Sequence, residues 1–126
     1  MSTQSAVPEP QPGSVALIAS ASHVRLVLAG ELDLLMKTEL LDAVRQAVLH
    51  ELPVEVDARH VTFMDSSVIA TLSRLIQASR HRPAFIDPAP VVRFLLEVTG
   101  IGALVDIVDE GDAATSTAAP TSRRAP

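Results

Sequence analysis

Asp65, Ser66 and Ser67 are the residues of this 126-residue sequence whose types and spacing most clearly allow chemistry. They follow an apolar run that ends in Phe63-Met64 and precede a helical pattern, so they should lie where a strand passes into a helix. The first backbone N–H groups of a helix have no partner inside the helix. Asp and Ser side chains are preferred caps for these groups, and capping is the simplest role for the three residues.

The same position also suits a regulatory phosphate. A phosphate on Ser66 would lie at a helix N-terminus, where the helix dipole and the N–H groups favour negative charge. It would add roughly −1.5 to −2 charges to a neutral side chain. A partner that docks on the unmodified serine would then face an unpaired dianion. Cap and switch are compatible interpretations, and the local pattern alone does not choose between them.

Other chemistries find less support. Asp57 follows a short strand, as the phosphoacceptor of a receiver domain does, but no acidic pair follows the first strand to hold Mg²⁺, and Lys37 is misplaced for the receiver lysine. Ser66 lacks the Gly-x-Ser-x-Gly setting of a hydrolase nucleophile. The histidines are too scattered for a local metal motif; they are His23, His50, His60 and His81. We therefore expect no enzyme, no metal and no cofactor.

Composition narrows the partners and the location. Apolar residues make up 48% of the chain but only three residues are aromatic, and the formal net charge is −5, so neither base stacking nor phosphate attraction favours a nucleic-acid partner. There are no cysteines, no secretory signal pattern at the start and no apolar run near the roughly 20 residues of a membrane span. These features predict a cytoplasmic protein without direct membrane insertion.

Hydrophobic periodicity predicts an α/β domain. Alternation at Val15 and Leu17, and again from Val24 to Leu28, predicts a β-hairpin. Further strands are expected at 53–57, 83–87 and 103–107, and helices at 40–49, 68–76 and 90–99. This order implies a mixed sheet of about five strands with helices packed on it. We expect the folded domain to span 13–110, with disordered tails at 1–12 and 111–126.

Three segments in a fixed order resemble the sulfate-transporter and anti-sigma-factor-antagonist (STAS) domain. They are 27–33, ending in Gly-Glu-Leu-Asp; 54–57 with 61–67, ending in Asp-Ser-Ser; and 90–96 with Gly100-Ile101. The resemblance covers about residues 13–110 and implies a single STAS-like domain.

That resemblance implies a function and a set of site residues. Stand-alone members bind an anti-sigma factor when unphosphorylated and so release a sigma factor. The anti-sigma factor is a serine kinase of the histidine-kinase-like type, and a serine phosphatase reverses its action. The usual phosphoacceptor, directly after the loop Asp, maps to Ser66, with Ser67 as second choice. By resemblance Asp33, Asp65, Ser66, Ser67 and Val68 form the surface that contacts the partner.

One departure from the family pattern leaves an alternative open. The family loop usually reads Asp-Ser-Ser-Gly-Leu, whereas Val68-Ile69 follows Ser67 here. Either valine narrows the approach to Ser66, because it has a branched Cβ, or it merely starts the helix. The first case favours an alternative function, a non-switching subunit or scaffold of a larger assembly, such as a stress-sensing complex or a lipid-transporter ATPase complex. Binding of a small ligand is a third hypothesis.

Overall fold

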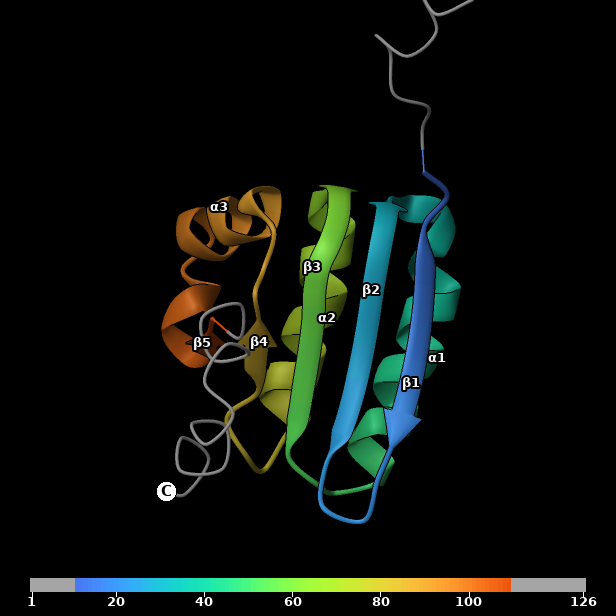
Figure 1. Ribbon diagram of the computed structural model, residues 1–126, viewed down its shortest axis with the longest axis vertical. Helices are drawn as coiled ribbons and strands as arrows, with labels where there is room; N and C mark the ends of the chain where they lie inside the picture. Colours follow the sequence, from blue (N-terminus) through green and yellow to red (C-terminus); the bar gives the residue numbers. More distant parts are fainter. Residues whose placement is uncertain (1–10, 110–126) are drawn as a thin grey trace, which may run out of the picture.

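One mixed sheet organises residues 11–109, the part of the chain that the computed structural model describes. Its strand order follows the sequence, and only the first pair is antiparallel (Figure 1). The strands are β1 (Ser14–Ala19), β2 (Val24–Leu32), β3 (Val54–Met64), β4 (Ala84–Ile86) and β5 (Asp106–Val108). The predicted hairpin and mixed sheet are confirmed.

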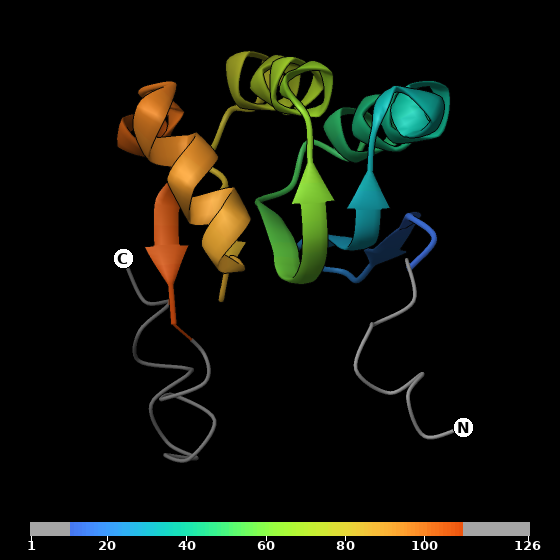
Figure 2. The ribbon, with the colours of Figure 1, turned by 90° about the horizontal axis from the view of Figure 1, so that it is seen from above.

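Within residues 11–109, three α-helices and two short 3₁₀ helices connect the strands. The α-helices are α1 (Lys37–Leu49), α2 (Ser66–Ala78) and α3 (Pro90–Val98), and the 3₁₀ helices are η2 (Leu34–Met36) and η3 (Ile101–Leu104). Helices α1 and α2 lie side by side on one face of β2 and β3, and α3 lies toward the β4–β5 side (Figures 1 and 2). No helix within residues 11–109 is long and apolar enough to cross a membrane.

The core is almost wholly aliphatic, in keeping with a sequence that has only three aromatic residues. Alternate residues of β2 point into it, because side chains of a strand alternate between the two faces. Helices α1, α2 and α3 each pack one apolar stripe against these residues of the sheet. Its fully buried members include Leu26, Leu28, Leu32, Val56, Leu40, Val68, Leu72, Leu75, Phe85, Val92 and Leu96.

Strands β3 and β5 differ from their predicted bounds by three residues or more. Strand β3 continues to Met64 instead of ending at Asp57. Register shifts against β2 interrupt the alternation of buried and exposed residues along β3, so the sequence pattern does not reveal its full length. The last strand begins at Asp106 instead of 103, because residues 101–104 turn into η3 after Gly100. Gly100 itself ends α3 in the left-handed region, at φ 79°, as the sequence predicts.

The folded part also starts earlier than predicted. Gln11 and Pro12, assigned to a disordered tail, contact the end of β2: the Glu31 N–H donates to the Gln11 carbonyl at 3.0 Å, and Pro12 forms a bridge with Glu31. A Cβ on Gly30 would lie 2.2 Å from the Pro12 carbonyl oxygen, so this approach requires glycine. The rest of the predicted tails, 1–10 and 111–126, lies outside the described residues, as does residue 110.

The core packing predicts a large difference between two leucines on neighbouring helices. Leu72 of α2 is 1% exposed and Leu49 of α1 is 79% exposed. We expect Leu72→Ala to lower the free energy of unfolding by about 2–5 kcal/mol, because it leaves a cavity. Leu49→Ala should change it by less than about 0.5 kcal/mol. Urea midpoints measure both, and equal losses in the two variants would contradict this core.

Candidate phosphorylation and partner-binding site

The ends of β2 and β3 bring two acidic loop residues to one edge of the sheet. The strands are parallel and their last residues, Leu32 and Met64, are paired. Asp33 and Asp65 follow directly, and the Asp65 N–H donates to the Leu32 carbonyl at 3.2 Å. The loops at the carboxyl ends of parallel strands are where α/β proteins commonly place functional residues.

Asp65 caps helix α2. Its backbone is extended (φ −97°, ψ 176°), and its carboxylate accepts hydrogen bonds from the N–H groups of Ser67 (3.0 Å) and Val68 (3.2 Å). The same oxygen, Oδ1, accepts the Ser67 hydroxyl at 2.6 Å. The predicted capping role is therefore present, with Asp65 as the cap and the serines inside the first turn.

These contacts keep the carboxylate charged. The Ser67 hydroxyl lowers the pKa of Asp65 most; partial burial opposes it, and the backbone N–H groups of Val68 and Ser67 lower it further. The backbone of Leu34 adds a smaller contribution of the same sign. Hydrogen bonds that favour the ionised form are the physical cause.

The two serines are placed differently. Ser66 is the first residue of α2 and is exposed, and no hydrogen bond of its hydroxyl is found within residues 11–109. Ser67 is half-buried and its hydroxyl is held by Asp65. A kinase could approach the Ser66 hydroxyl without first breaking an internal hydrogen bond, whereas the Ser67 hydroxyl would have to leave a carboxylate.

Two sequence-based expectations need correction here. The N–H groups of Ser67 and Val68 are not available to a phosphate, because Asp65 already occupies them. The Val68 side chain is 1% exposed and belongs to the core, so it has no surface to offer a partner. For the same reason it does not narrow the space outside Ser66. The exposed stripe of α2 begins instead with Ser66 and Ala70.

Asp33 shapes a turn that carries exposed leucines. Its Oδ1 accepts the Leu35 N–H at 3.0 Å and so caps η2, which contacts α2. Leu34 is 61% exposed and Leu35 88% exposed. Phe63, near the end of β3, is 47% exposed. We call Leu34 and Leu35 the apolar rim.

Sequence reasoning missed the apolar rim. The available signal is an apolar run, Leu34-Leu35-Met36, directly after Asp33 and ahead of the helical pattern that begins near Leu40. This run does not continue the apolar stripe of the helix that follows. The pattern therefore gives it no position in the core and favours exposure to solvent.

Asp57 lies away from this site, in an ionic network. It projects from the sheet face opposite the core cluster and accepts hydrogen bonds from Arg59 Nε (3.0 Å) and Arg25 Nη1 (3.5 Å). Arg25 also pairs with Glu55 at 2.9 Å, and Arg59 with Asp87 at 3.7 Å. Asp57 is thus engaged by two guanidinium groups, which suits a structural ion pair better than a phosphoacceptor.

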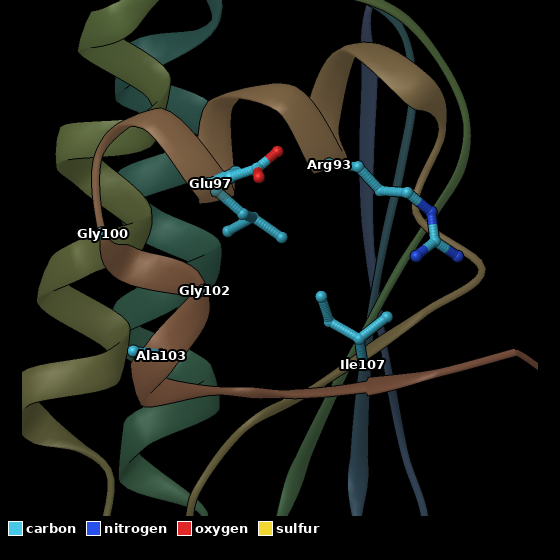
Figure 3. Close-up of a pocket in the computed structure, with 7 residues that line it drawn as sticks. Arg93, Glu97, Gly100, Gly102, Ala103 and Ile107 are labelled. Atoms are coloured by element: carbon cyan, nitrogen blue, oxygen red, sulfur yellow. The ribbon is translucent and has the colours of Figure 1, made fainter.

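A pocket lies at the β5 edge of the sheet, between α3, η3 and β5 (Figure 3). Its volume is about 430 Å³, and it is lined by Arg93, Leu96, Glu97, Gly100, Gly102, Ala103 and Ile107. The Arg93 guanidinium is already bound to the Pro88 carbonyl and to Asp109. Few polar groups converge on the pocket, so it adds little to the hypothesis of a small-ligand binder. Within residues 11–109, no group of three His, Asp or Glu side chains is arranged to hold a metal ion.

The chain belongs to the STAS domain family. The family model described as "Mlab, STAS domain" matches residues 15–107, which is most of the chain and nearly all of the described fold. A comparison with curated proteins gives no significant match.

Solved structures share the fold at low sequence identity. An anti-sigma factor antagonist from Mycobacterium paratuberculosis superposes with a TM-score of 0.72 at 18% identity, over 87% of this chain and 97% of that one. The anti-sigma factor antagonist SpoIIAA in its unphosphorylated form gives 0.63 at 22% identity, over 80% and 93%. The Bacillus cell fate determinant SpoIIAA in its phosphorylated form gives 0.62 at 19%, over 82% and 99%. At these identities the likeness shows the α/β fold with its mixed five-stranded sheet.

The cap predicts a pH dependence of stability. The pKa of Asp65 is lowered in the folded state, so its contribution is present above the unfolded-state pKa of about 3.9 and is lost as pH falls through the folded-state pKa. Asp65→Asn should lower the free energy of unfolding at pH 7 by up to about 1 kcal/mol and reduce the further loss between pH 4 and pH 2.

Urea unfolding across that pH range measures this effect. Asp42→Asn is the matched control, because Asp42 is exposed on α1 and accepts only a 3.3 Å bond from Gln46 among the hydrogen bonds of the described residues. An acid profile of Asp65→Asn that parallels the unmodified protein would show that the Asp65 charge does not stabilise the fold.

Proposed function

We propose that this protein is an anti-sigma factor antagonist controlled by phosphorylation of Ser66. In its unphosphorylated form it binds an anti-sigma factor, which is a serine kinase of the histidine-kinase-like type, and so releases a sigma factor. The kinase phosphorylates Ser66 and ends the interaction, and a serine phosphatase restores it. The protein acts in the cytoplasm as a binding module and as a kinase substrate, not as a catalyst.

The observation that carries this proposal is the setting of Ser66. Its hydroxyl is exposed at the first turn of α2, beside a turn whose leucines are exposed, in a fold shared with proteins described as anti-sigma factor antagonists. For one such protein, SpoIIAA, both an unphosphorylated and a phosphorylated form are described. An accessible hydroxyl beside exposed leucine side chains is what a phosphorylation-sensitive docking surface requires.

Charge explains how phosphorylation would end binding. The unmodified surface offers a neutral hydroxyl and exposed leucine side chains, which a partner can bury at little electrostatic cost. A phosphate there adds roughly −1.5 to −2 charges, and burying it without a cationic partner is strongly unfavourable. The capping carboxylate of Asp65 adds to the negative potential at the same place.

Phosphate transfer tests the site directly. We expect an anti-sigma kinase to be captured when this protein is purified from its native cells, and with that kinase and Mg²⁺-ATP the unmodified chain should gain one phosphate by intact mass. Ser66→Ala should gain none. Ser67→Ala is the matched control and should still be labelled, because Ser66 remains in place. Full labelling of Ser66→Ala, or loss of labelling only in Ser67→Ala, would mean that the phosphoacceptor is a residue other than Ser66.

The apolar rim predicts a binding defect that is separate from phosphorylation. Leu35→Ala should weaken binding to the same partner by about tenfold or more, because a leucine that is buried at an interface contributes roughly 1.5–3 kcal/mol. Leu49→Ala, which alters a similarly exposed leucine at the end of α1, is the control and should bind normally. Calorimetric titration measures both, and equal affinities would place the docking surface elsewhere.

A second candidate is a non-switching STAS subunit or scaffold in a stress-sensing complex or a lipid-transporter ATPase complex. The description of the matching family model as "Mlab, STAS domain" favours keeping it. Val68 gives it less support than the sequence suggests, because this side chain lies in the core. A complex that is unchanged by Ser66→Asp would favour this candidate, and one that dissociates would favour the switch.

A further inference from the structure

Strand β1 forms an edge of the sheet that carries no protection against pairing. Within residues 11–109 its one neighbouring strand is β2, and it lies at the opposite edge of the sheet from β5 (Figure 1). Its six residues, Ser14–Ala19, include no charged residue and no proline. Ile18 is 58% exposed, and Ala16 and Ala19 are exposed as well. Proteins usually protect a free edge with charges, proline or a very short strand, and β1 has none of these features.

The other edge of the same sheet is protected. Strand β5 has three residues, and its first residue, Asp106, pairs with Arg82 at 3.0 Å. Asp109, directly after β5, pairs with Arg93. A short strand between two ion pairs is a poor template for another strand. Of the two edges in the described part of the chain, β1 is therefore the one that is suited to add a strand.

The hydrogen bonds of the β1–β2 hairpin fix which backbone groups of β1 face outward. The Ser20 N–H donates to the His23 carbonyl at 2.9 Å, so these two residues occupy a hydrogen-bonded pair position. Such positions alternate with non-hydrogen-bonded ones along an antiparallel pair. With the observed register, the even-numbered residues of β1 therefore direct their N–H and C=O groups toward β2. The odd-numbered residues direct theirs toward the free edge; they are Val15, Leu17 and Ala19.

These outward groups are complementary to a second copy of themselves. If two β1 strands lie antiparallel with Leu17 opposite the partner's Leu17, the two residues exchange both hydrogen bonds. Val15 then exchanges both with the partner's Ala19, and Ala16 lies opposite the partner's Ile18. Every cross-strand pair is apolar, so the contact buries no charge and brings no like charges together. A contact with this two-fold symmetry closes on itself and leaves the protected β5 edges outermost.

We propose that two copies of this chain associate through β1, with the strands antiparallel and centred on Leu17, so that their sheets join into one. Helix α1 packs on β1 and lies behind it in Figure 1, so the two copies of α1 would flank the two-fold axis. The strand contact is short compared with a permanent interface, so the dimer forms reversibly as concentration rises. The β2 strands of the two copies then run in opposite directions, which places the two Ser66 sites at opposite ends of the joined sheet. Pairing through β1 therefore leaves each site open to a partner and does not depend on the proposed function.

The mass of the full-length chain in solution tests the pairing. In sedimentation equilibrium over a concentration series, we expect the mass to rise from one chain toward two and no further. Ala19→Pro removes an outward N–H from each strand but none that bonds β2, so it should raise the dimer dissociation constant at least about tenfold. Ala19→Ser keeps that N–H and is the matched control, expected within about twofold of the unmodified chain. If Ala19→Pro disturbs folding, Ala16→Lys, which adds a charge to the edge, should weaken the dimer in the same direction.

Cross-linking tests the register. The chain has no cysteine, so each single variant carries one thiol. Ala16→Cys mixed with Ile18→Cys should oxidise to a covalent heterodimer, because opposite residues of a non-hydrogen-bonded pair have Cα atoms about 4.5 Å apart, within disulfide range. Either variant alone should give several times less covalent dimer, because its two thiols lie on a diagonal of about 7–8 Å. Intact mass distinguishes the heterodimer from the two homodimers.

The outcomes separate this pairing from the other ways in which the edge could be used. A single-chain mass at every concentration, or equal cross-linking in the mixed and unmixed samples, would overturn the dimer. Species that grow beyond two chains would overturn its closed symmetry. A chain that stays monomeric, and whose Ala19→Pro variant no longer binds the anti-sigma kinase, would assign the edge to that partner instead. Phosphate transfer to Ser66 should be the same in Ala19→Pro and the unmodified chain, so the dimer and the proposed function can fail independently.

Discussion

The capping of helix α2 by the Asp65 carboxylate is the interaction on which the site depends. A helix that begins at a sheet edge needs acceptors for its first N–H groups, and here one oxygen serves two of them together with the Ser67 hydroxyl. Because the cap fixes where the helix starts, it also fixes its phase. Ser66 and Ala70 then face outward while Val68 and Leu72 face the core.

Sheet topology sets the position of this cap relative to the other loop. The partner of Val24 on β3 is Val54, thirty residues on, while the partner of Leu32 is Met64, thirty-two residues on. The register shifts between them lengthen β3, so that both strands finish at the same level and the Asp65 N–H meets the Leu32 carbonyl. An irregularity in the middle of the sheet therefore brings the α2 N-terminus next to the turn that bears Leu34 and Leu35.

Sequence reasoning reached the features that depend on local pattern. The order of elements, the aliphatic core and the placement of Asp65-Ser66 at a strand-to-helix junction follow from periodicity and capping preferences. It missed what tertiary packing decides: the length of β3 and the exposure of Leu35. Val68 is instructive, because its helical spacing with Leu72 and Leu75 already placed it on the buried face, and only the family resemblance suggested a partner contact.

The identity of the capping residue bears on how well Ser66 would serve as a switch. A neutral cap, such as serine or threonine, leaves the helix dipole uncompensated, so a phosphate nearby would be stabilised within its own chain. An aspartate that already holds these N–H groups removes most of that stabilisation. The added charge then stays uncompensated at the surface, where an approaching partner must desolvate it or avoid it. The Asp65 carboxylate, which stabilises the fold, would in this way make phosphorylation of Ser66 act mainly on the affinity for a partner.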